Sequence, residues 1–514
     1  MKVNDGFDNS FYYPGHRKSN KLLHEGGAIF SIARVPGLRT VASYCIGGAE
    51  PVKLAPMEQG TLKRQLGLFD ALMLIVGDII GIGIFVTTGD IAQSVPSPGG
   101  ILLIWLLGGL LALAGALSCA ELAASMPVSG GDYNYLRAAY GPLVGFLSGW
   151  SSFLVTFSGS IALLAVVFTV FLSFFFPVLS LDRTLFTFNG FGYSAGFSLG
   201  HLFSLLVVYV LSAIHYVGVG VAATVQNILT LLKVGAIVGI ILLAALIGNG
   251  SMDHFSPFFD WSKITPSLFG LAFIPVIFTY AGWNAAIYMA GEVREPERNL
   301  PRALIGATLL VIVLYLAINA VYFYAVPVEK MRGAIRVSEL ATTALFGRET
   351  SAWITAIITV SILGALNVTS MIGPRVSHAM ARDGLFFHSL ARVHPRFSTP
   401  SNAIMLQALW VSVLVLTGTF GTLLSYVSVV IGLFSALTVG SLLVLRVKRP
   451  DLYRPYKIWG YPWVPWFFIL ANICIAASIL WEKPIDALRG FGIVALGVPA
   501  YLFWKGRSKE PGRA

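Results

Sequence analysis

The chain has little charge: only 11% of its 514 residues are Asp, Glu, Lys or Arg, whereas 56% are hydrophobic. A soluble domain carries roughly 25% charged residues, so this shortage argues against a water-soluble enzyme. The three cysteines, Cys45, Cys119 and Cys474, are too few for a disulfide framework, and no zinc-binding spacing is present. The sequence also contains no GxSxG, Walker or HExxH motif. We therefore predict no catalytic residues, no cofactor and no metal site.

Long apolar segments dominate what is present. A membrane-crossing helix needs about 20 mostly apolar residues. Twelve segments meet this requirement: 67–95, 100–125, 138–177, 198–217, 219–248, 265–292, 299–326, 350–381, 400–418, 421–446, 460–482 and 487–505. The sequence therefore predicts an all-α polytopic membrane protein with 12 transmembrane helices and the lipid bilayer as a partner.

The distribution of basic residues predicts the orientation. If both termini lie inside, the inner segments carry more than twice as many Lys and Arg residues as the outer segments. Cytoplasmic loops normally carry such an excess. We therefore predict that both termini are cytoplasmic. The same excess explains most of the formal net charge of +11 without nucleic acid as a partner.

Composition divides the chain into three parts. Residues 1–60 are polar and mixed in charge, and they contain no apolar core long enough for a secretory signal. We expect either a disordered cytoplasmic tail there or a mis-set start, because Met57 opens a stretch that reads as a natural beginning. The membrane domain is predicted over 61–507, and a short C-terminal tail over 508–514.

The spans also suggest an internal repeat. Spans one to five cover about 67–248, spans six to ten cover about 265–446, and two extra helices follow at about 460–505. Five helices in a block is an odd number, so the second block must enter the membrane from the opposite side. Inverted repeats of this kind are typical of secondary transporters.

Two spans in matching positions of the blocks contain helix-breaking residues. The first has Gly81 and Gly83 near its middle, and the sixth has Pro275 and Gly282. Small residues also occur where membrane helices pack closely, which is the alternative explanation. Paired breaks are the better sequence indicator of a midplane binding site, with N–H donors for a carboxylate and carbonyl acceptors for an ammonium. An α-amino acid carries both groups.

Six motifs then make the chain recognisable. They are GDIIGIGIFV (77–86), AELAASMPVSGGDYNYL (120–136), VQNILTLLK (225–233), FTYAGWN (278–284), EVREPERNLPRA (292–303) and LRVKRPDLYRPYK (445–457). With them the chain resembles the amino acid–polyamine–organocation superfamily, and within it the L-type amino acid transporters, from about residue 62 to 507. The resemblance implies the LeuT-like five-plus-five inverted repeat with two extra helices.

The resemblance also implies two groups of substrate-binding residues. The substrate carboxylate is expected at Ile79, Ile82 and Gly83. The ammonium is expected among Phe278, Thr279 and Ala281, mostly through backbone carbonyls, with Phe278 as the gating aromatic residue. Many relatives have Ser or Thr where Ile82 stands, so one side-chain donor is missing here. Trp283 is equally consistent with substrate contact and with core packing.

Three polar residues within the predicted spans need an explanation. An ammonium in hydrocarbon costs at least about 2.5 kcal/mol, so Lys233 in the fifth span needs a partner or a wet cavity. The resemblance implies that Lys233 replaces a sodium ion and braces the first helix; snorkelling to the interface is the alternative. Asp78 is interpreted as a partner for Lys233, a proton-coupling carboxylate, or an anion that favours cationic substrates. Asn367 in the eighth span is a candidate substrate-binding residue.

These observations predict a secondary active transporter of amino acids that works by alternating access. Neutral L-amino acids are expected as substrates, by sodium-independent exchange or proton-linked uptake. The alternative is a proton-coupled carrier of polyamines or cationic amino acids, and the remote one is a membrane-embedded enzyme or receptor. Human L-type relatives attach to a heavy chain through an outer-loop cysteine, but residues 178–197 contain none. We therefore expect no disulfide-linked heavy chain, and a location in a cell (inner) membrane.

Overall fold

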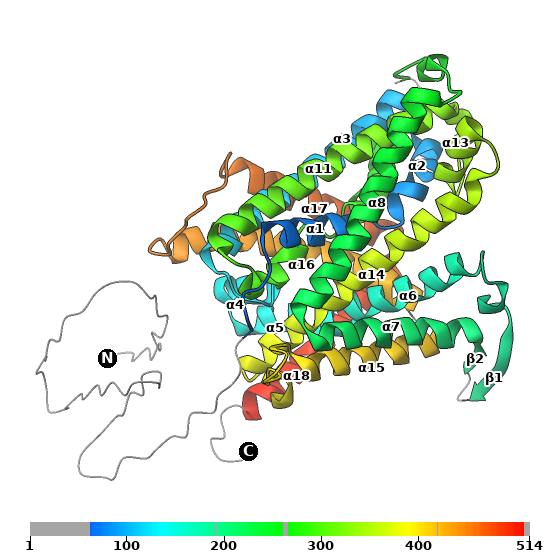
Figure 1. Cartoon of the computed structure of the whole chain (residues 1–514). Helices are drawn as coiled ribbons and strands as arrows, with labels where there is room; N and C mark the ends of the chain where they lie inside the picture. Colours follow the sequence, from blue (N-terminus) through cyan, green and yellow to red (C-terminus); the bar gives the residue numbers. More distant parts are fainter. Residues whose placement is uncertain (1–61, 191–192, 261–265, 419, 508–514) are drawn as a thin grey trace, which may run out of the picture. The chain divides into compact units, whose positions relative to one another are not determined.

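The computed structural model of the chain describes residues 62–190, 193–260, 266–418 and 420–507. The predicted tails at 1–60 and 508–514 lie outside these residues, so their structure stays a prediction. The described part is built from α-helices and one hairpin (Figure 1). The helices are α1 Leu68–Ile79, α2 Gly83–Ser94, α3 Pro98–Ser125, α4 Asp132–Tyr140, α5 Pro142–Ser151, α6 Phe157–Leu172, α7 Leu199–Val217, α8 Val219–Ile247, α9 Pro266–Thr279, α10 Ala285–Tyr288, α11 Pro296–Ala325, α12 Val328–Met331, α13 Val337–Phe346, α14 Thr350–Arg382, α15 Ser401–Thr417, α16 Phe420–Lys448, α17 Trp463–Glu482 and α18 Pro484–Arg507.

The helices confirm the all-α polytopic class. Among the described residues, nine helices are long and apolar enough to cross a membrane, or ten if the bent pair α1 and α2 forms one span. The predicted spans 265–292 and 400–418 correspond to shorter elements, namely α9 with α10 and α15. The protein is therefore a multi-pass membrane protein. The total of 12 transmembrane helices and the inverted repeat stay predictions.

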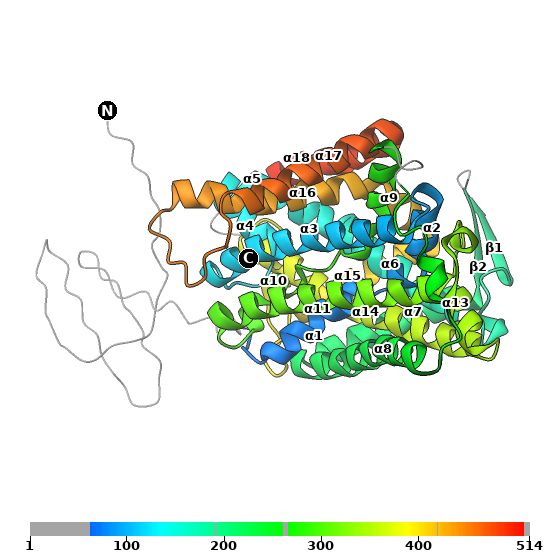
Figure 2. The same cartoon turned by 90° about the horizontal axis from the view of Figure 1, so that it is seen from above.

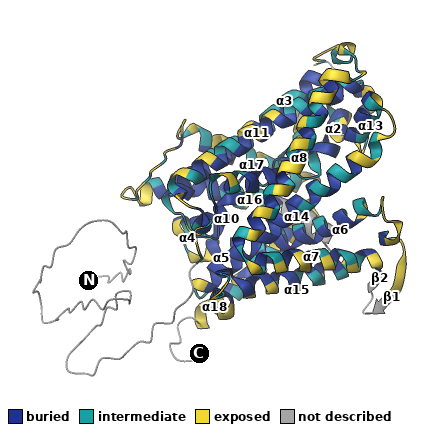
Figure 3. Cartoon of the chain, in the orientation of Figure 1, coloured by how far each residue is buried: buried dark blue, intermediate teal, exposed yellow. Residues whose placement is uncertain are grey.

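One helix, α14, lies at the centre of the packing. In its most apolar window 78% of the residues are buried, against 28% in α8 (Figure 3). It contacts α1, α6 and α8, while α11 packs along α3 and also touches α1 (Figure 2). The short helix α1 is thus enclosed by α8, α11 and α14. Its surroundings place the first predicted break in the interior of the protein.

The segment between α6 and α7 contains a structure that the sequence did not predict. Strand β1, Thr184–Gly190, pairs antiparallel with β2, Tyr193–Ser198. Phe186 lies opposite Phe197, and their stacked rings are 4.7 Å apart between centroids. Aromatic cross-strand pairs stabilise such hairpins. The hairpin is a small addition to the predicted all-α fold.

The third predicted span, 138–177, corresponds mainly to one long helical span, Pro142–Leu172. Helix α4 ends before Gly141, whose φ of 98° requires glycine, and Pro142 then begins α5. A π-helical segment, Ser152–Thr156, joins α5 to α6, which ends at Leu172. The unusual length of the predicted span therefore comes mostly from the 31-residue helix Pro142–Leu172, with the end of α4 before it and a short segment after it.

The chain before α1 pairs with the chain after α10. Leu66 forms a parallel bridge with Val293, and Arg294 N–H donates to the Leu66 carbonyl at 2.8 Å. Gln65 N–H donates to the Glu292 carbonyl, also at 2.8 Å. These bonds tie the beginning of the first broken span to the end of the sixth.

Candidate functional site

The first span is broken where its glycines predicted. Helix α1 ends at Ile79, α2 begins at Gly83, and the two are bent by 40°. Between them the Gly81 N–H donates to the Ile79 carbonyl at 2.9 Å, a short-range bond that an α-helix does not contain. Carbonyl oxygens around the break are therefore released from the helical pattern and need other donors.

Lys233 of α8 supplies such a donor. Its side chain is buried, and Nζ lies 2.6 Å from the Gly77 carbonyl oxygen, 2.8 Å from that of Ile80 and 3.4 Å from that of Ser361 in α14. An ammonium has three N–H donors and no acceptor, so three carbonyl oxygens match its capacity. The geometry is that of a cation held by the first break, with no snorkelling to the surface.

The sixth span is also interrupted, over five residues between Thr279 and Ala285. Pro275 lies inside α9, and Gly282 has a φ of 102°, which side chains rarely adopt. The turn makes its own bonds, from Ala281 N–H to the Phe278 carbonyl at 3.1 Å and from Ala285 N–H to the Gly282 carbonyl at 3.0 Å. This break therefore needs less support from neighbouring helices.

The aromatic residues of this break differ in their surroundings. Phe278 is 45% exposed, and the adjacent turn residue Ala281 is exposed as well. Trp283 is buried and packs edge-on against Phe468 of α17, with ring centroids 5.5 Å apart. Of the two interpretations of Trp283, this contact favours core packing. The Phe278 ring is thus left partly uncovered, whereas Trp283 is covered by its neighbours.

The two breaks are in contact. A β-carbon on Gly83 would overlap the side chain of Thr279, so only glycine allows this approach. Thr279 Oγ1 lies 3.1 Å from Thr87 Oγ1 of α2. Tyr315 of α11, to which no sequence pattern drew attention, places its hydroxyl 2.9 Å from the Ile79 carbonyl oxygen and 3.4 Å from that of Thr279. One side chain thus joins both interruptions.

Asp78 lies at the same junction. A β-carbon on Gly282 would fall within 3 Å of the Asp78 side chain, which shows how closely the carboxyl group meets the second break. Oδ1 accepts a hydrogen bond of 3.4 Å from Thr369 of α14. The hydrogen bonds of Lys233 go to carbonyls instead of to this carboxylate. The arrangement brings Asp78 beside the predicted ligand groups without making it the direct partner of Lys233.

Asn367, a candidate substrate-binding residue, lies in a network of buried polar side chains. It is completely buried, its Oδ1 lies 2.9 Å from His215 Nε2, and its Nδ2 donates to Gln226 Oε1 at 2.9 Å. From Gln226 the hydrogen bonds continue through Thr230 to the Met73 carbonyl of α1. Asn367 therefore belongs to a polar network that connects α7, α14, α8 and α1. A substrate-binding role for Asn367 stays a prediction, and in this structure its amide is held by His215 and Gln226.

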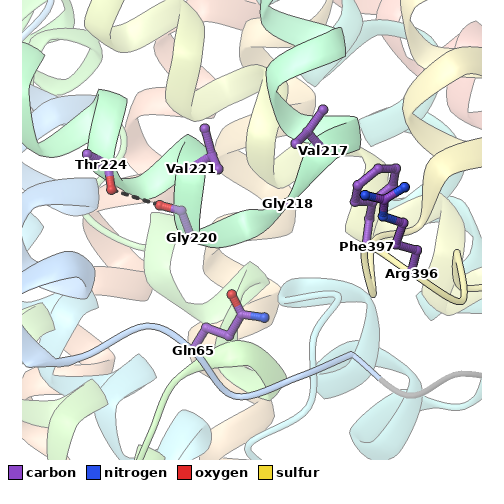
Figure 4. A pocket seen from close by; sticks show the side chains of 8 residues that line it. All are labelled: Gln65, Val217, Gly218, Gly220, Val221, Thr224, Arg396 and Phe397. Carbon is purple, nitrogen blue, oxygen red and sulfur yellow. Dashed lines mark hydrogen bonds between the residues drawn. The ribbon is translucent and has the colours of Figure 1, made fainter.

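A pocket of about 410 Å³ lies elsewhere, at the junction of α7 and α8. Figure 4 shows Gln65 on one side of it and Arg396 with Phe397 on another. None of the predicted substrate-binding residues lines it. The pocket is open and its arginine is exposed, so it lacks the enclosed, converging polar groups of a binding site for a small polar molecule.

The chain matches known proteins over most of its length. Residues 66–489 match the family model described as "Amino acid permease". The chain is 31% identical over 476 residues to "Large neutral amino acids transporter small subunit 2" of Oryctolagus cuniculus, covering 90% of this chain and 86% of that protein. It is 30% identical over 456 residues to "Serine/threonine exchanger SteT" of Bacillus subtilis (strain 168), covering 88% and 99%. The "b(0,+)-type amino acid transporter 1" of Homo sapiens is 30% identical over 430 residues, covering 82% and 84%. With two interrupted helices meeting inside a polytopic bundle, the chain belongs to the amino acid permease family, within the amino acid–polyamine–organocation superfamily.

Proposed function

We propose that the chain is a secondary active transporter of amino acids, with neutral L-amino acids as its substrates, and that it works by alternating access. The observation that carries the proposal is the contact between the two broken helices, where Gly83 meets Thr279. A zwitterion needs donors for its carboxylate and acceptors for its ammonium a few ångströms apart. Two helix breaks in contact supply both kinds of backbone group at one place.

The carboxylate is assigned to the first break. Gly83 is the first residue of α2, and the beginning of a helix offers N–H groups and the positive end of the helix dipole. Ile79 and Ile82 flank this position. Because Ile82 has no hydroxyl group, we expect binding there to depend on the backbone alone.

The ammonium is assigned to the second break. Carbonyls of Phe278, Thr279 and Ala281 lie where α9 ends and the turn begins. The exposed ring of Phe278 is adjacent, so we assign it the role of a gate over the bound substrate. These two sites contact the carboxylate and the ammonium group of an amino acid and leave its side chain unconstrained. This is consistent with several neutral amino acids as substrates.

Transport is expected to be independent of sodium. In transporters with broken helices, carbonyls released by a break often coordinate a sodium ion. Here the Gly77 and Ile80 carbonyls accept from the Lys233 ammonium. A fixed positive charge therefore stands where a mobile cation would otherwise be bound.

One observation favours a second candidate function. Asp78 lies against Gly282, next to the groups assigned to the substrate, and its Lys233 neighbour is bound to carbonyls. An ionised carboxylate there would attract a second positive charge. The alternative is therefore a proton-coupled carrier of cationic amino acids or polyamines, with Asp78 as the proton or cation site.

Uptake into proteoliposomes distinguishes the two. The purified protein is reconstituted, and labelled leucine, alanine, arginine and putrescine are tested with and without internal amino acid, a proton gradient and sodium. The proposal predicts neutral amino acid uptake that requires internal substrate or a proton gradient and ignores sodium. Uptake of arginine or putrescine that is lost in Asp78→Asn would establish the alternative, and no uptake by folded protein would contradict both.

Two finer proposals concern assembly and location. We propose that the transporter works without a disulfide-linked heavy chain, because the outer segment 178–197 contains no cysteine. We also propose a cell (inner) membrane location with cytoplasmic termini, from the distribution of basic residues. Full uptake by the protein purified alone tests the first. Protease or antibody access to tags at each terminus in right-side-out vesicles tests the second.

A further inference from the structure

Two acidic side chains in segments predicted to face the cytoplasm are buried with arginine partners. Glu121 of α3 accepts from Arg446 of α16 at 2.9 and 2.6 Å. Glu292, just after α10, accepts two hydrogen bonds from Arg375 of α14, at 2.9 and 3.1 Å. Burying a carboxylate is costly unless it is paired and hydrogen-bonded, and both glutamates meet that condition.

A third buried acid, Asp132 in the first turn of α4, is different. It is 9% exposed, and its Oδ2 accepts one hydrogen bond from the Tyr288 hydroxyl at 2.7 Å. Its Oδ1 has no hydrogen-bond partner, although the atom is buried. In the described part of the chain no Lys, Arg or His forms an ion pair with it. Burial without a cationic partner disfavours the ionised form of a carboxyl group.

The groups that face Asp132 include no cation. Its neighbours are Tyr288 of α10, Asn284 of the second break, Cys119 of α3, Tyr135 of α4 and Thr438 of α16. The hydroxyl groups of Tyr135 and Thr438 are themselves buried without partners. These neighbours are uncharged, so they offset the cost of burying an ionised carboxylate less than a lysine or arginine would. Burial raises the pKa of Asp132 to about 6.

The loop that carries Asp132 holds the end of the second broken span. Gly130 N–H donates to the Tyr288 carbonyl at 3.1 Å, and Gly291 N–H donates to Ser129 Oγ at 3.1 Å. The ring of Tyr288 lies so close to Gly131 that a β-carbon there would overlap it. With the Tyr288–Asp132 bond, these contacts dock α10 onto the loop 129–132, here called the docking loop.

We propose that Asp132 is a proton-binding site that controls the docking of α10: protonation of the carboxyl group favours the arrangement in which α10 rests on the docking loop, and release of the proton to water favours the arrangement in which α10 has moved away. The ionised carboxylate is more stable when water reaches it, so ionisation favours the undocked arrangement. Before α10 docks again, the carboxylate takes a proton from water. As a link between pH and transport this proposal rests on the proposed function, because α10 continues the substrate-binding break.

Cysteine labelling tests the docking directly. The parent protein carries Cys45→Ser and Cys474→Ser. In one variant of this parent, Ser129→Cys introduces a cysteine at the contact with α10. In a second variant, Val128→Cys introduces a cysteine at the exposed neighbouring position. Labelling by a maleimide is followed in detergent as a function of pH. Dividing the labelling rate of the Ser129→Cys protein by that of the Val128→Cys protein removes the common effect of pH on thiol ionisation. The parent protein, which has neither introduced cysteine, gives the background labelling of Cys119.

With Asp132 present, the ratio is expected to rise about tenfold between about pH 5 and about pH 7.5, as the ionised fraction of a group with a pKa of about 6 does. Asp132→Asn should keep the ratio at its low-pH value throughout. Tyr288→Phe removes the hydrogen bond that favours the carboxylate, so it should move the midpoint to higher pH. Tyr324→Phe, which removes a hydroxyl bound to the Gly248 carbonyl, is the matched control and should leave the midpoint unchanged.

A ratio that does not change with pH, or one that changes equally in Asp132→Asn, would overturn the proposal. Labelling requires no transport, so its result is independent of the proposed function. Protein that transports amino acids but shows no pH-dependent labelling contradicts only the proton site. Protein that shows the labelling change but transports nothing contradicts only the proposed function. If Asp132→Asn does not fold, the midpoint shift of Tyr288→Phe against Tyr324→Phe decides the matter.

Discussion

The two broken helices are interrupted for different reasons. The first break is held by side chains from other helices, with Lys233 on the Gly77 and Ile80 carbonyls and Tyr315 on the Ile79 carbonyl. The second is broken by its own residues, Pro275 and Gly282, and closes its own turn bonds. Glycines mark the first break, but side chains of other helices satisfy its carbonyls, whereas the second break is stabilised mainly by bonds within its own turn. Removing a neighbour should damage the first, and changing the turn itself should damage the second.

Lys233→Met should have the largest effect. It removes an ammonium that satisfies buried carbonyls, and each buried polar group left without a partner costs about 1–3 kcal/mol. We expect substrate exchange in proteoliposomes to fall by more than about tenfold, with a lower unfolding temperature. Lys330→Met, at an exposed position of α12, is the control and should leave both unchanged. Normal exchange by Lys233→Met would show that the first break needs no external support.

Gly282→Ala, which changes the second break, should cause the next largest loss of substrate exchange. Alanine at a φ of 102° is strained by about 1–3 kcal/mol, and its β-carbon would meet the Asp78 side chain. We expect exchange to fall about tenfold. Gly235→Ala in α8, where a β-carbon has open space, should retain exchange and raise the unfolding temperature slightly. Equal effects of the two substitutions would argue that the turn conformation is unimportant.

Tyr315→Phe tests the side chain that joins both breaks. It removes the hydroxyl group that lies 2.9 Å from the Ile79 carbonyl oxygen and 3.4 Å from that of Thr279, a loss of about 1 kcal/mol. We expect the KM for neutral amino acids to rise about fivefold while the protein stays folded. Tyr324→Phe loses a hydroxyl bound to the Gly248 carbonyl, away from both breaks, and provides the comparison. A KM equal to that of the parent would leave Lys233 as the sole important support.

The smallest expected effect is a pH dependence of stability at the end of the second break. Burial raises the pKa of Asp132 from 3.8 to about 6. Between these values the folded state binds more protons than the unfolded state, so stability falls as the pH rises through this window. From about pH 5 to about pH 7 we expect a loss of about 1 kcal/mol, measured as a lower unfolding temperature. Asp132→Asn should remove this slope, and an identical slope in the variant would assign it to other groups.

Much of the fold was predictable because a membrane imposes it. Apolar segments of sufficient length must form helices, since hydrocarbon offers no partners for backbone polar groups. The helix-breaking residues Gly81, Gly83, Pro275 and Gly282 likewise marked both interruptions. The hairpin formed by β1 and β2 was not predicted, because it lies outside the membrane segments and depends on cross-strand pairs such as Phe186 with Phe197.

The partners of polar side chains were less predictable. Asn367 looked like a substrate-binding residue, yet it is bound by His215 and Gln226. Tyr315 gave no signal, because the apolar helix α11 contains other tyrosines, Tyr322 and Tyr324, that look the same in the sequence. Asp132 lies in a motif that was noted only for its resemblance. Its isolation among uncharged groups depends on helices that are far apart in the chain.

The sequence by itself determined which segments enter the membrane and where two of them are interrupted, because hydrophobicity and backbone freedom are properties of single residues and short runs. Only the tertiary structure decided what each polar group meets: Lys233 the carbonyls of the first break, Asp78 the turn of the second, and Asp132 a set of uncharged neighbours. Electrostatic energy in a low-dielectric interior depends on distances of a few ångströms, and those distances are set by the packing of helices.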